Sequence, residues 1–240
     1  MPILKPNYST QIITPSHHIT ENFILKYNLS QYSYHYNNFR KKSKNNDTKI
    51  YLWCSPKFYY NNNLQKMRND FNIAFNTLKI KDFIFKKVNS EINLIGNINS
   101  ALAVFIRSTQ HYSNINFNIM MNGIIKELIS LLEKYEKIII FTQVIEVVDL
   151  LKKTEIQHKL YFKNQNNMYS NYNNGDWFKN KNMNEVFIKQ EFEDCLIDLL
   201  IASRCKCVMG GVSNMMFTVL IMNPNIEFKL FDVLQNINGL

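Results

Sequence analysis

Residues 194–214 read DCLIDLLIASRCKCVMGGVSN, and this stretch runs from a helix through a short strand into a tight turn. Gly210 and Gly211 follow the expected strand, and glycine lets the backbone turn sharply and approach a ligand. Ser213 or Asn214 can then cap the next helix, whose free N–H groups attract phosphate. We interpret the stretch as the phosphate-binding turn of a nucleotide site.

A second strand ends in FIRSTQHY at residues 105–112 and places Arg107 where the strand meets its loop. Arg107 and the capped helix could grip one pyrophosphate, because a guanidinium and helix N–H groups both bind phosphate oxygens. Two structural alternatives remain open at this point. Arg107 could form an ion pair at a strand end, and Ser213 could serve only as a helix cap.

The pattern beyond residue 99 alternates short apolar strands with longer amphipathic helices. This alternation predicts an α/β fold with a doubly wound parallel sheet of the Rossmann type. We expect strands at 101–106, 137–141, 159–161, 205–209 and 227–231, and helices at 118–135, 144–152, 184–202 and 213–222. Ligands of such sheets bind at the carboxyl ends of the strands, where Arg107, Thr142, Gly210 and Gly211 all fall.

Residues 1–99 do not continue this alternation. They predict a strand at 50–54, helices at 63–75 and 80–94, and irregular structure over the first 48 residues. We therefore divide the chain into a partial N-terminal region at 1–99 and a Rossmann-like nucleotide-binding domain at 100–240.

The composition indicates a folded protein of the cytoplasm. The chain has 240 residues, of which 46% are hydrophobic, and the sequence has neither a leader pattern nor an apolar run that could span a membrane. Its four cysteines fit neither a disulfide framework nor a zinc site, so we expect no metal. Cys205 and Cys207 lie two apart on the expected strand, which predicts that both point to one face, in the core.

The formal net charge of +9 raises the possibility of a nucleic-acid partner. However, the chain is rich in Asn, Ile, Tyr, Phe and Lys, which A/T-rich codons specify, so part of the charge can reflect codon bias. The single basic cluster, at residues 40–44, is typical of a solvated loop. We expect no nucleic-acid partner.

Three motifs in residues 100–232 resemble the donor-binding half of the fucosyltransferase-like GT-B glycosyltransferases. This superfamily includes the α1,6-, nodulation and protein O-fucosyltransferases. The first motif is VFIRSTQ at 104–110, and the second is IIIFTQ at 138–143. The third runs from Asp198 through SRC at 203–205 to GGVSN at 210–214 and ends in Asn223 and Pro224. The usual N-terminal half of the GT-B architecture, which carries acceptor contacts, is missing or much reduced in residues 1–99. The resemblance thus implies a partial acceptor-side region at 1–99 and a nucleotide-sugar-binding domain at 100–240.

The resemblance implies a metal-independent, inverting transfer of a sugar such as fucose from a GDP-sugar to a glycan or protein hydroxyl. It implies no cofactor, and it assigns the β-phosphate to Arg107 and the same diphosphate to Ser213. The expected donor-binding residues are Arg107, Thr109, Thr142, Asp198, Gly210, Gly211, Ser213 and Asn214. Asp198 could contact the nucleotide, orient the turn or face solvent.

The catalytic base is the least defined part of the expected site. We expect the catalytic groups to be Arg107 and His111, and the alternative for His111 is a solvated or locally hydrogen-bonded side chain. Phe105 stands where the family has a histidine, and Gln110 and Gln143 stand where acids are usual. These departures support a second hypothesis, a catalytically inactive nucleotide-sugar-binding or scaffolding domain.

Overall fold

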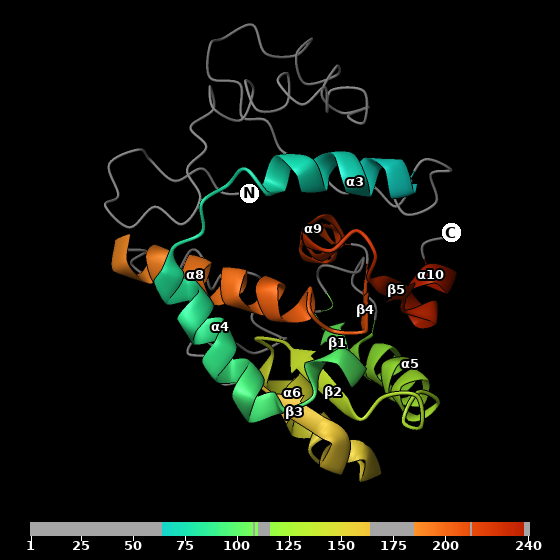
Figure 1. The fold of residues 1–240 in the computed structure, drawn as a ribbon. Helices are drawn as coiled ribbons and strands as arrows, with labels where there is room; N and C mark the ends of the chain where they lie inside the picture. The colour runs from blue at the N-terminus through green and yellow to red at the C-terminus, as the bar shows by residue number, and fades with distance from the viewer. Residues whose placement is uncertain (1–63, 108, 110–115, 164–184, 212, 238–240) are drawn as a thin grey trace, which may run out of the picture.

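The computed structural model describes residues 64–107, 109, 116–163, 185–211 and 213–237 (Figure 1). Its centre is one sheet of five parallel strands in the order β3-β2-β1-β4-β5. The strands are β1 (Ala101–Phe105), β2 (Lys137–Phe141), β3 (Leu160–Phe162), β4 (Cys207–Gly210) and β5 (Glu227–Leu230).

Helices cover both faces of this sheet. One face carries α5 (Phe117–Ile129), α6 (Ile145–Leu151) and α10 (Asp232–Ile237). The other face carries α4 (Asp82–Ile95), α8 (Glu185–Ala202) and α9 (Asn214–Met222), and α3 (Leu64–Phe75) lies over α9 (Figure 1). Short 3-10 helices precede β1 (Ile98–Ser100) and β3 (Glu155–Lys159). The predicted doubly wound parallel α/β sheet is confirmed.

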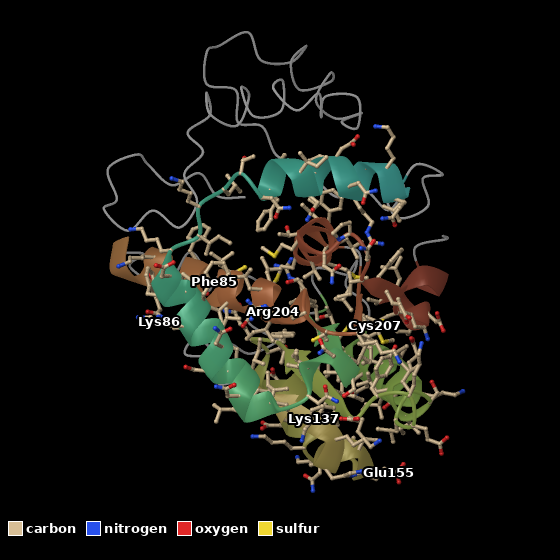
Figure 2. The ribbon with its side chains drawn as sticks, in the orientation of Figure 1. Phe85, Lys86, Lys137, Glu155, Arg204 and Cys207 are labelled. Atoms are coloured by element: carbon tan, nitrogen blue, oxygen red, sulfur yellow. The ribbon has the colours of Figure 1, made fainter. Side chains whose placement is uncertain are left out.

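The central strands β1 and β4 are apolar and fully buried, whereas the outer strands β3 and β5 are partly exposed. In β1, Ala103 and Phe105 belong to the core beneath α8 and α9, whereas Leu102 and Val104 belong to the core beneath α5 and α6. All five residues of β1 are buried, as expected for the central strand of a parallel sheet. Side chains fill the space between the sheet and the helices (Figure 2).

The strand order reverses between β1 and β4. The chain winds from β1 to β2 and β3 in one direction, and then returns through α8 to β4 and β5 on the other side of β1. Phe105, the last residue of β1, is in register with Gly210, the last residue of β4. Ligands of doubly wound sheets bind in the crevice at such a reversal, outside the carboxyl ends of the strands.

Helix α3 is attached to the connection between α9 and β5 through polar contacts. Arg68 Nη2 donates hydrogen bonds to the carbonyl oxygens of Asn223 and Ile226, at 3.1 and 2.7 Å. Asn72 Nδ2 donates to the carbonyl oxygen of Ile221 at 2.7 Å. These donors satisfy carbonyl groups at and just beyond the C-terminus of α9 that have no partner within a helix. Residues of α3 and α4 also belong to the core that includes β1.

Most of the predicted elements agree with the structure to within a few residues, but the helix predicted at 118–135 is too long. Helix α5 ends at Ile129, and tighter turns follow, in which the N–H of Leu131 bonds the carbonyl of Leu128. The Ser130 hydroxyl also donates to the Glu127 carbonyl at 2.7 Å, and such local bonds compete with a continuing helix. The strand predicted at 50–54 and the first 48 residues lie outside the described residues.

The prediction that Cys205 and Cys207 point to one face is wrong, although both side chains are buried as expected. Strand β4 begins only at Cys207, and Cys205 lies in the preceding turn, where its N–H bonds the Ala202 carbonyl. Cys205 therefore packs with α8 and α9, whereas Cys207, labelled in Figure 2, packs on the opposite face of the sheet. In the part of the chain that the structure describes, no helix is both long and apolar enough to cross a membrane.

Candidate functional site

Side chains that could bind a ligand or take part in a reaction follow several strands at the carboxyl edge of the sheet. Arg107 follows β1, Thr142 follows β2, and Lys163 follows β3. Gly211 and Ser213 lie between β4 and α9. Because all five strands are parallel, these positions share one edge of the sheet. Arg107 and Ser213 follow β1 and β4, the two strands between which the strand order reverses.

Ser213 caps helix α9. Its Oγ accepts a hydrogen bond from the backbone N–H of Met216 at 3.2 Å, and its own backbone is extended. The cap fixes the start of a nine-residue helix whose remaining N–H groups point toward the edge of the sheet. Asn214 is the first residue of α9, and the position of its side chain is outside the described structure.

Gly210 has little room for a side chain. A Cβ atom at this position would lie 3.2 Å from the Phe105 carbonyl oxygen and 3.5 Å from the Met216 sulfur. Its neighbour in the sheet, Phe105, stacks on Phe141 with ring centroids 4.9 Å apart and an angle of 23° between the ring planes. The position where the resembling family has a histidine is therefore part of a buried aromatic pair.

Arg107 lies two residues beyond the end of β1, and its side chain is partly buried. Its charge acts on the thiol of Cys195 in α8. The pKa of Cys195 is raised to about 12, chiefly by burial and then by the carboxylates of Asp198 and Glu191, whereas the charges of Arg107 and Lys163 oppose the shift. The thiol of Cys195 is therefore acted on by charges from residues that follow β1 and β3 and from α8 itself.

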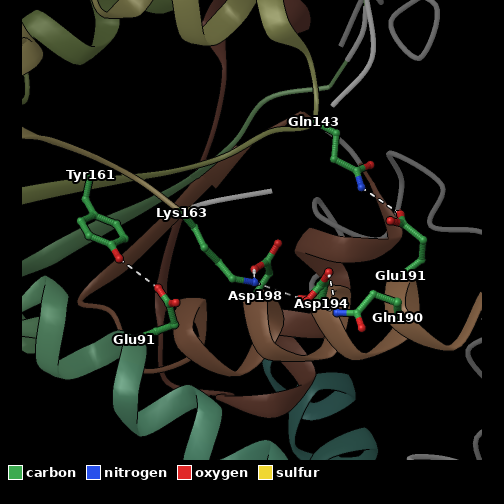
Figure 3. A network of polar contacts seen from close by, with 8 residues as sticks. All are labelled: Glu91, Gln143, Tyr161, Lys163, Gln190, Glu191, Asp194 and Asp198. Carbon is green, nitrogen blue, oxygen red and sulfur yellow. Dashed lines mark hydrogen bonds and ion pairs between the residues drawn. The ribbon is translucent and has the colours of Figure 1, made fainter. Parts of the chain in front are cut away.

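Asp198 is buried in α8 and forms an ion pair with Lys163, whose side chain is equally buried (Figure 3). The Lys163 ammonium also contacts the carbonyl oxygen of Asp194, at 3.4 Å. Asp198 therefore does not face solvent, which was one of the alternatives left open by the sequence. Lys163 was not predicted as a site residue; the signal was a lysine immediately after an apolar strand, at the edge where ligands bind.

Helix α8 also contacts the end of β2. The Gln143 amide donates a hydrogen bond to Glu191 Oε2 at 2.9 Å (Figure 3). On the same helix, the Gln190 amide donates to both carboxylate oxygens of Asp194, which lies four residues later, at 3.2 Å each. Thr142, which is buried, uses its Oγ1 to accept from the N–H of Val144 at 3.1 Å and so orders the start of α6.

The structure thus gathers Arg107, Thr142, Gly210, Gly211 and Ser213 at one edge, with Asp198 on the adjoining helix. Thr109 is buried. His111, the predicted base, lies outside the described residues, and so do Ser108 and Gln110. Among the residues that the structure describes, no group of three or more His, Cys, Asp or Glu side chains could hold a metal ion.

The fold described above is a doubly wound α/β domain whose strand order reverses between β1 and β4, the place where such domains bind ligands. No protein-family model matches the chain, and no curated protein sequence matches it. Among solved structures, the chain is similar to NodZ α1,6-fucosyltransferase soaked with GDP-fucose, with 14% identity and a TM-score of 0.47 over 91% of this chain and 63% of that one.

Two further solved structures are also similar to this chain. One is the fucosyltransferase NodZ from Bradyrhizobium, with 16% identity and a TM-score of 0.44 over 66% of this chain and 47% of that one. The other is POFUT1 in its apo form, with 10% identity and a TM-score of 0.44 over 72% of this chain and 50% of that one. The chain spans less than two thirds of the length of these three proteins.

Proposed function

We propose that this protein binds a nucleoside diphosphate-sugar at the carboxyl edge of the sheet and transfers the sugar to a hydroxyl group. One observation carries the proposal: Arg107 and the capped N-terminus of α9 follow neighbouring strands, β1 and β4, at the reversal of strand order. Phe105 and Gly210, which end these strands, are in register, so the two phosphate-binding elements start side by side.

The two elements suit a diphosphate because they offer different kinds of interaction. The Arg107 guanidinium supplies a fixed charge and up to five donors in a planar fork. The free N–H groups at the start of α9 supply the positive end of a helix dipole. As the bond between the sugar and the phosphate breaks, negative charge grows on the leaving nucleoside diphosphate, and both elements stabilise it.

The motif resemblance supplies the choice of donor. The three motifs resemble those of fucosyltransferase-like enzymes, so GDP-fucose is the donor to test first, with GDP as the product. The acceptor is proposed to be a hydroxyl group of a glycan or of a protein. The proposed roles are β-phosphate binding by Arg107 and diphosphate binding at Gly210, Gly211 and Ser213, with Thr109, Thr142, Asp198 and Asn214 as further donor contacts. The reaction needs no metal in this proposal.

A second candidate function is nucleotide-sugar binding without turnover. It is favoured by the stacked pair of Phe105 and Phe141, which puts an apolar ring where the resembling enzymes have a histidine. Phe105 supplies no polar group for the transfer reaction at this position. Binding of the diphosphate through Arg107 and α9 does not depend on such a group.

Turnover separates the two candidates. We would incubate the protein with GDP-fucose, with and without candidate glycans, and measure the GDP released. A glycosyltransferase releases GDP faster when the right acceptor is present, and Arg107→Ala abolishes the release. A binding domain shows saturable binding of GDP-fucose but releases no GDP above the rate in buffer.

A further inference from the structure

Helix α9, which starts at the proposed diphosphate site, is apolar on nearly all sides. Apart from Thr218, every residue from Met215 to Met222 is hydrophobic. Five of them are buried: Met216, Phe217, Val219, Leu220 and Ile221. A helix of this kind is covered on its outer face as well as on its inner one. The sheet and α8 cover one side of α9, and α3 lies over the other (Figure 1).

Helix α3 holds the outer side of α9 through an aromatic contact. Phe71 of α3 and Phe217 of α9 pack edge to face, with ring centroids 5.7 Å apart and an angle of 75° between the ring planes. Both residues are buried. Because edge-to-face pairs prefer one geometry, this contact restricts the rotation of α9 about its own axis.

Polar side chains of α3 hold the C-terminal end of α9. Asn72 Nδ2 donates hydrogen bonds to the carbonyl oxygens of Ile221 and Met222, at 2.7 and 3.1 Å. Arg68 is buried, and its Nη2 donates to the Asn223 carbonyl oxygen at 3.1 Å. The last carbonyl groups of a helix have no partner within it and form the negative end of its dipole. An amide and a guanidinium are therefore well suited to bind them.

The same end of α9 is also tied to α8. The Asn223 amide donates to the Ser203 carbonyl oxygen, just beyond α8, at 2.8 Å. Helix α9 has nine residues, so at 1.5 Å per residue it is roughly 13 Å long. A helix this short moves as one body, so a shift or tilt at its C-terminal end also moves the N–H groups at its N-terminus. Hydrogen bonds from these groups to a phosphate weaken when their distances and angles change.

We infer that Arg68 and Asn72 are positioning residues for the diphosphate, a role that rests on the proposed function. They bind carbonyl groups at the C-terminal end of α9 and so fix where the N–H groups at its N-terminus lie relative to the end of β1. Each residue acts through α9 rather than on the ligand itself. Donor binding thereby depends on α3, which precedes all three motifs in the sequence.

GDP affinity tests the inference, measured by calorimetry on the full chain at a temperature where circular dichroism shows every variant folded. Asn72→Leu removes the amide donor, and Arg68→Met removes the guanidinium, whereas Arg68→Lys keeps a cation at the end of α9. We expect Asn72→Leu and Arg68→Met to bind GDP roughly threefold to tenfold more weakly, the worth of about one hydrogen bond. The affinity of Arg68→Lys should lie between those of Arg68→Met and the wild type.

The matched control is Gly123→Ala, which disturbs the packing of α5 against α10 on the face of the sheet opposite α9. A variant that only loses stability keeps a normal site while it is folded. The GDP affinity of Gly123→Ala should therefore stay within about twofold of the wild type.

Unchanged GDP affinity in Asn72→Leu and Arg68→Met would overturn the inference, and so would an equal loss in Gly123→Ala. If Arg68→Met does not fold, Asn72→Leu decides, because it keeps the guanidinium and the aromatic contact. Failure of the proposed function has a different signature, since the folded wild type would then not bind GDP at all.

Discussion

Lys163 and Asp198 form a buried ion pair that joins the carboxyl end of β3 to the middle of α8. The two residues are 35 positions apart, and each is the other's charge partner inside the protein. The pair fixes the position of α8 relative to the carboxyl ends of the strands. As a consequence, it also fixes the positions of Glu191 and Cys195 there. It therefore belongs to the framework of the proposed site.

Breaking this pair on one side should be costly. Lys163→Met leaves the Asp198 charge buried without its partner, and we expect the free energy of unfolding to fall by about 3–5 kcal/mol. Lys66→Met is the control, because the Lys66–Asp70 pair is exposed and a surface pair contributes about 1 kcal/mol or less. Denaturation in guanidinium measures both. Equal losses in the two variants would contradict the account, and Lys163→Met/Asp198→Leu should recover most of the stability.

Arg68 should be essential for holding α3 on the fold. Its replacement by Met removes the donors to the Asn223 and Ile226 carbonyl oxygens, and a buried acceptor left without its partner costs about 1–3 kcal/mol. Gln65→Ala is the matched control from the same helix, since its bond to the Pro224 carbonyl, at 3.0 Å, is exposed. Urea denaturation should show a loss for Arg68→Met several times that for Gln65→Ala. A smaller loss for Arg68→Met would show that α3 is held by apolar packing alone.

Gly123 in α5 has no room for a side chain. A Cβ atom there would lie 2.7 Å from the Val233 Cβ in α10, so Gly123→Ala must push the two helices apart. Alanine favours a helix by about 1 kcal/mol over glycine, but overpacking costs about 1–3 kcal/mol, so we expect a net loss. Asn122→Ala, at the adjacent exposed position, keeps the favourable propensity without the clash. Thermal unfolding should show a lower Tm for Gly123→Ala only; a raised Tm would contradict the packing described here.

The attachment of α10 should depend on pH through Glu127. Its Oε1 accepts from the N–H groups of Asp232 and Val233, at 2.8 and 3.3 Å. Burial raises the pKa of Glu127 above its ordinary value of 4.5, and the charge of Asp232 adds to the shift while Lys229 and the two N–H groups oppose it. The folded state then binds more protons than the unfolded state between the two pKa values, so stability falls as the pH rises through this interval.

Glu127→Gln keeps an acceptor for the two N–H groups and does not titrate. The free energy of unfolding of the wild type, taken relative to this variant, should therefore decrease as the pH rises from below 4.5 to 7. Denaturant titrations at a series of pH values give this difference. An increase over the same interval would show that the hydrogen bonds and Lys229 outweigh burial.

The sheet could be predicted because the pattern that indicates each strand lies within a short stretch of sequence. Each strand is a short apolar run between amphipathic segments, and this alternation alone indicates a parallel sheet. The carboxyl-edge positions of Arg107, Thr142 and Gly210 followed directly. The cap formed by Ser213 was also predictable, since it depends on a residue three positions away.

Contacts between distant residues could not be predicted in this way. Helix α10 was missed because Glu127, more than 100 residues earlier, caps it. The engagement of Asp198 by Lys163 and of Glu191 by Gln143 depends on how α8 crosses the ends of β2 and β3. The limited room for a side chain at Gly210 could not be predicted from the sequence either, because it results from the nearby Phe105 backbone on the neighbouring strand. The catalytic and donor-binding roles assigned to all the site residues, and the division of the chain at residue 99, stay predictions.

The most direct test of the account is calorimetric titration of GDP into the wild type and Arg107→Ala, without added metal. The account predicts saturable binding of GDP to the wild type, weakened by roughly tenfold or more in Arg107→Ala, which corresponds to about 1.4 kcal/mol for one lost phosphate contact. Circular dichroism should show both proteins equally folded. Absence of GDP binding to the folded wild type, or equal affinity in the two proteins, would contradict a diphosphate site between β1 and β4.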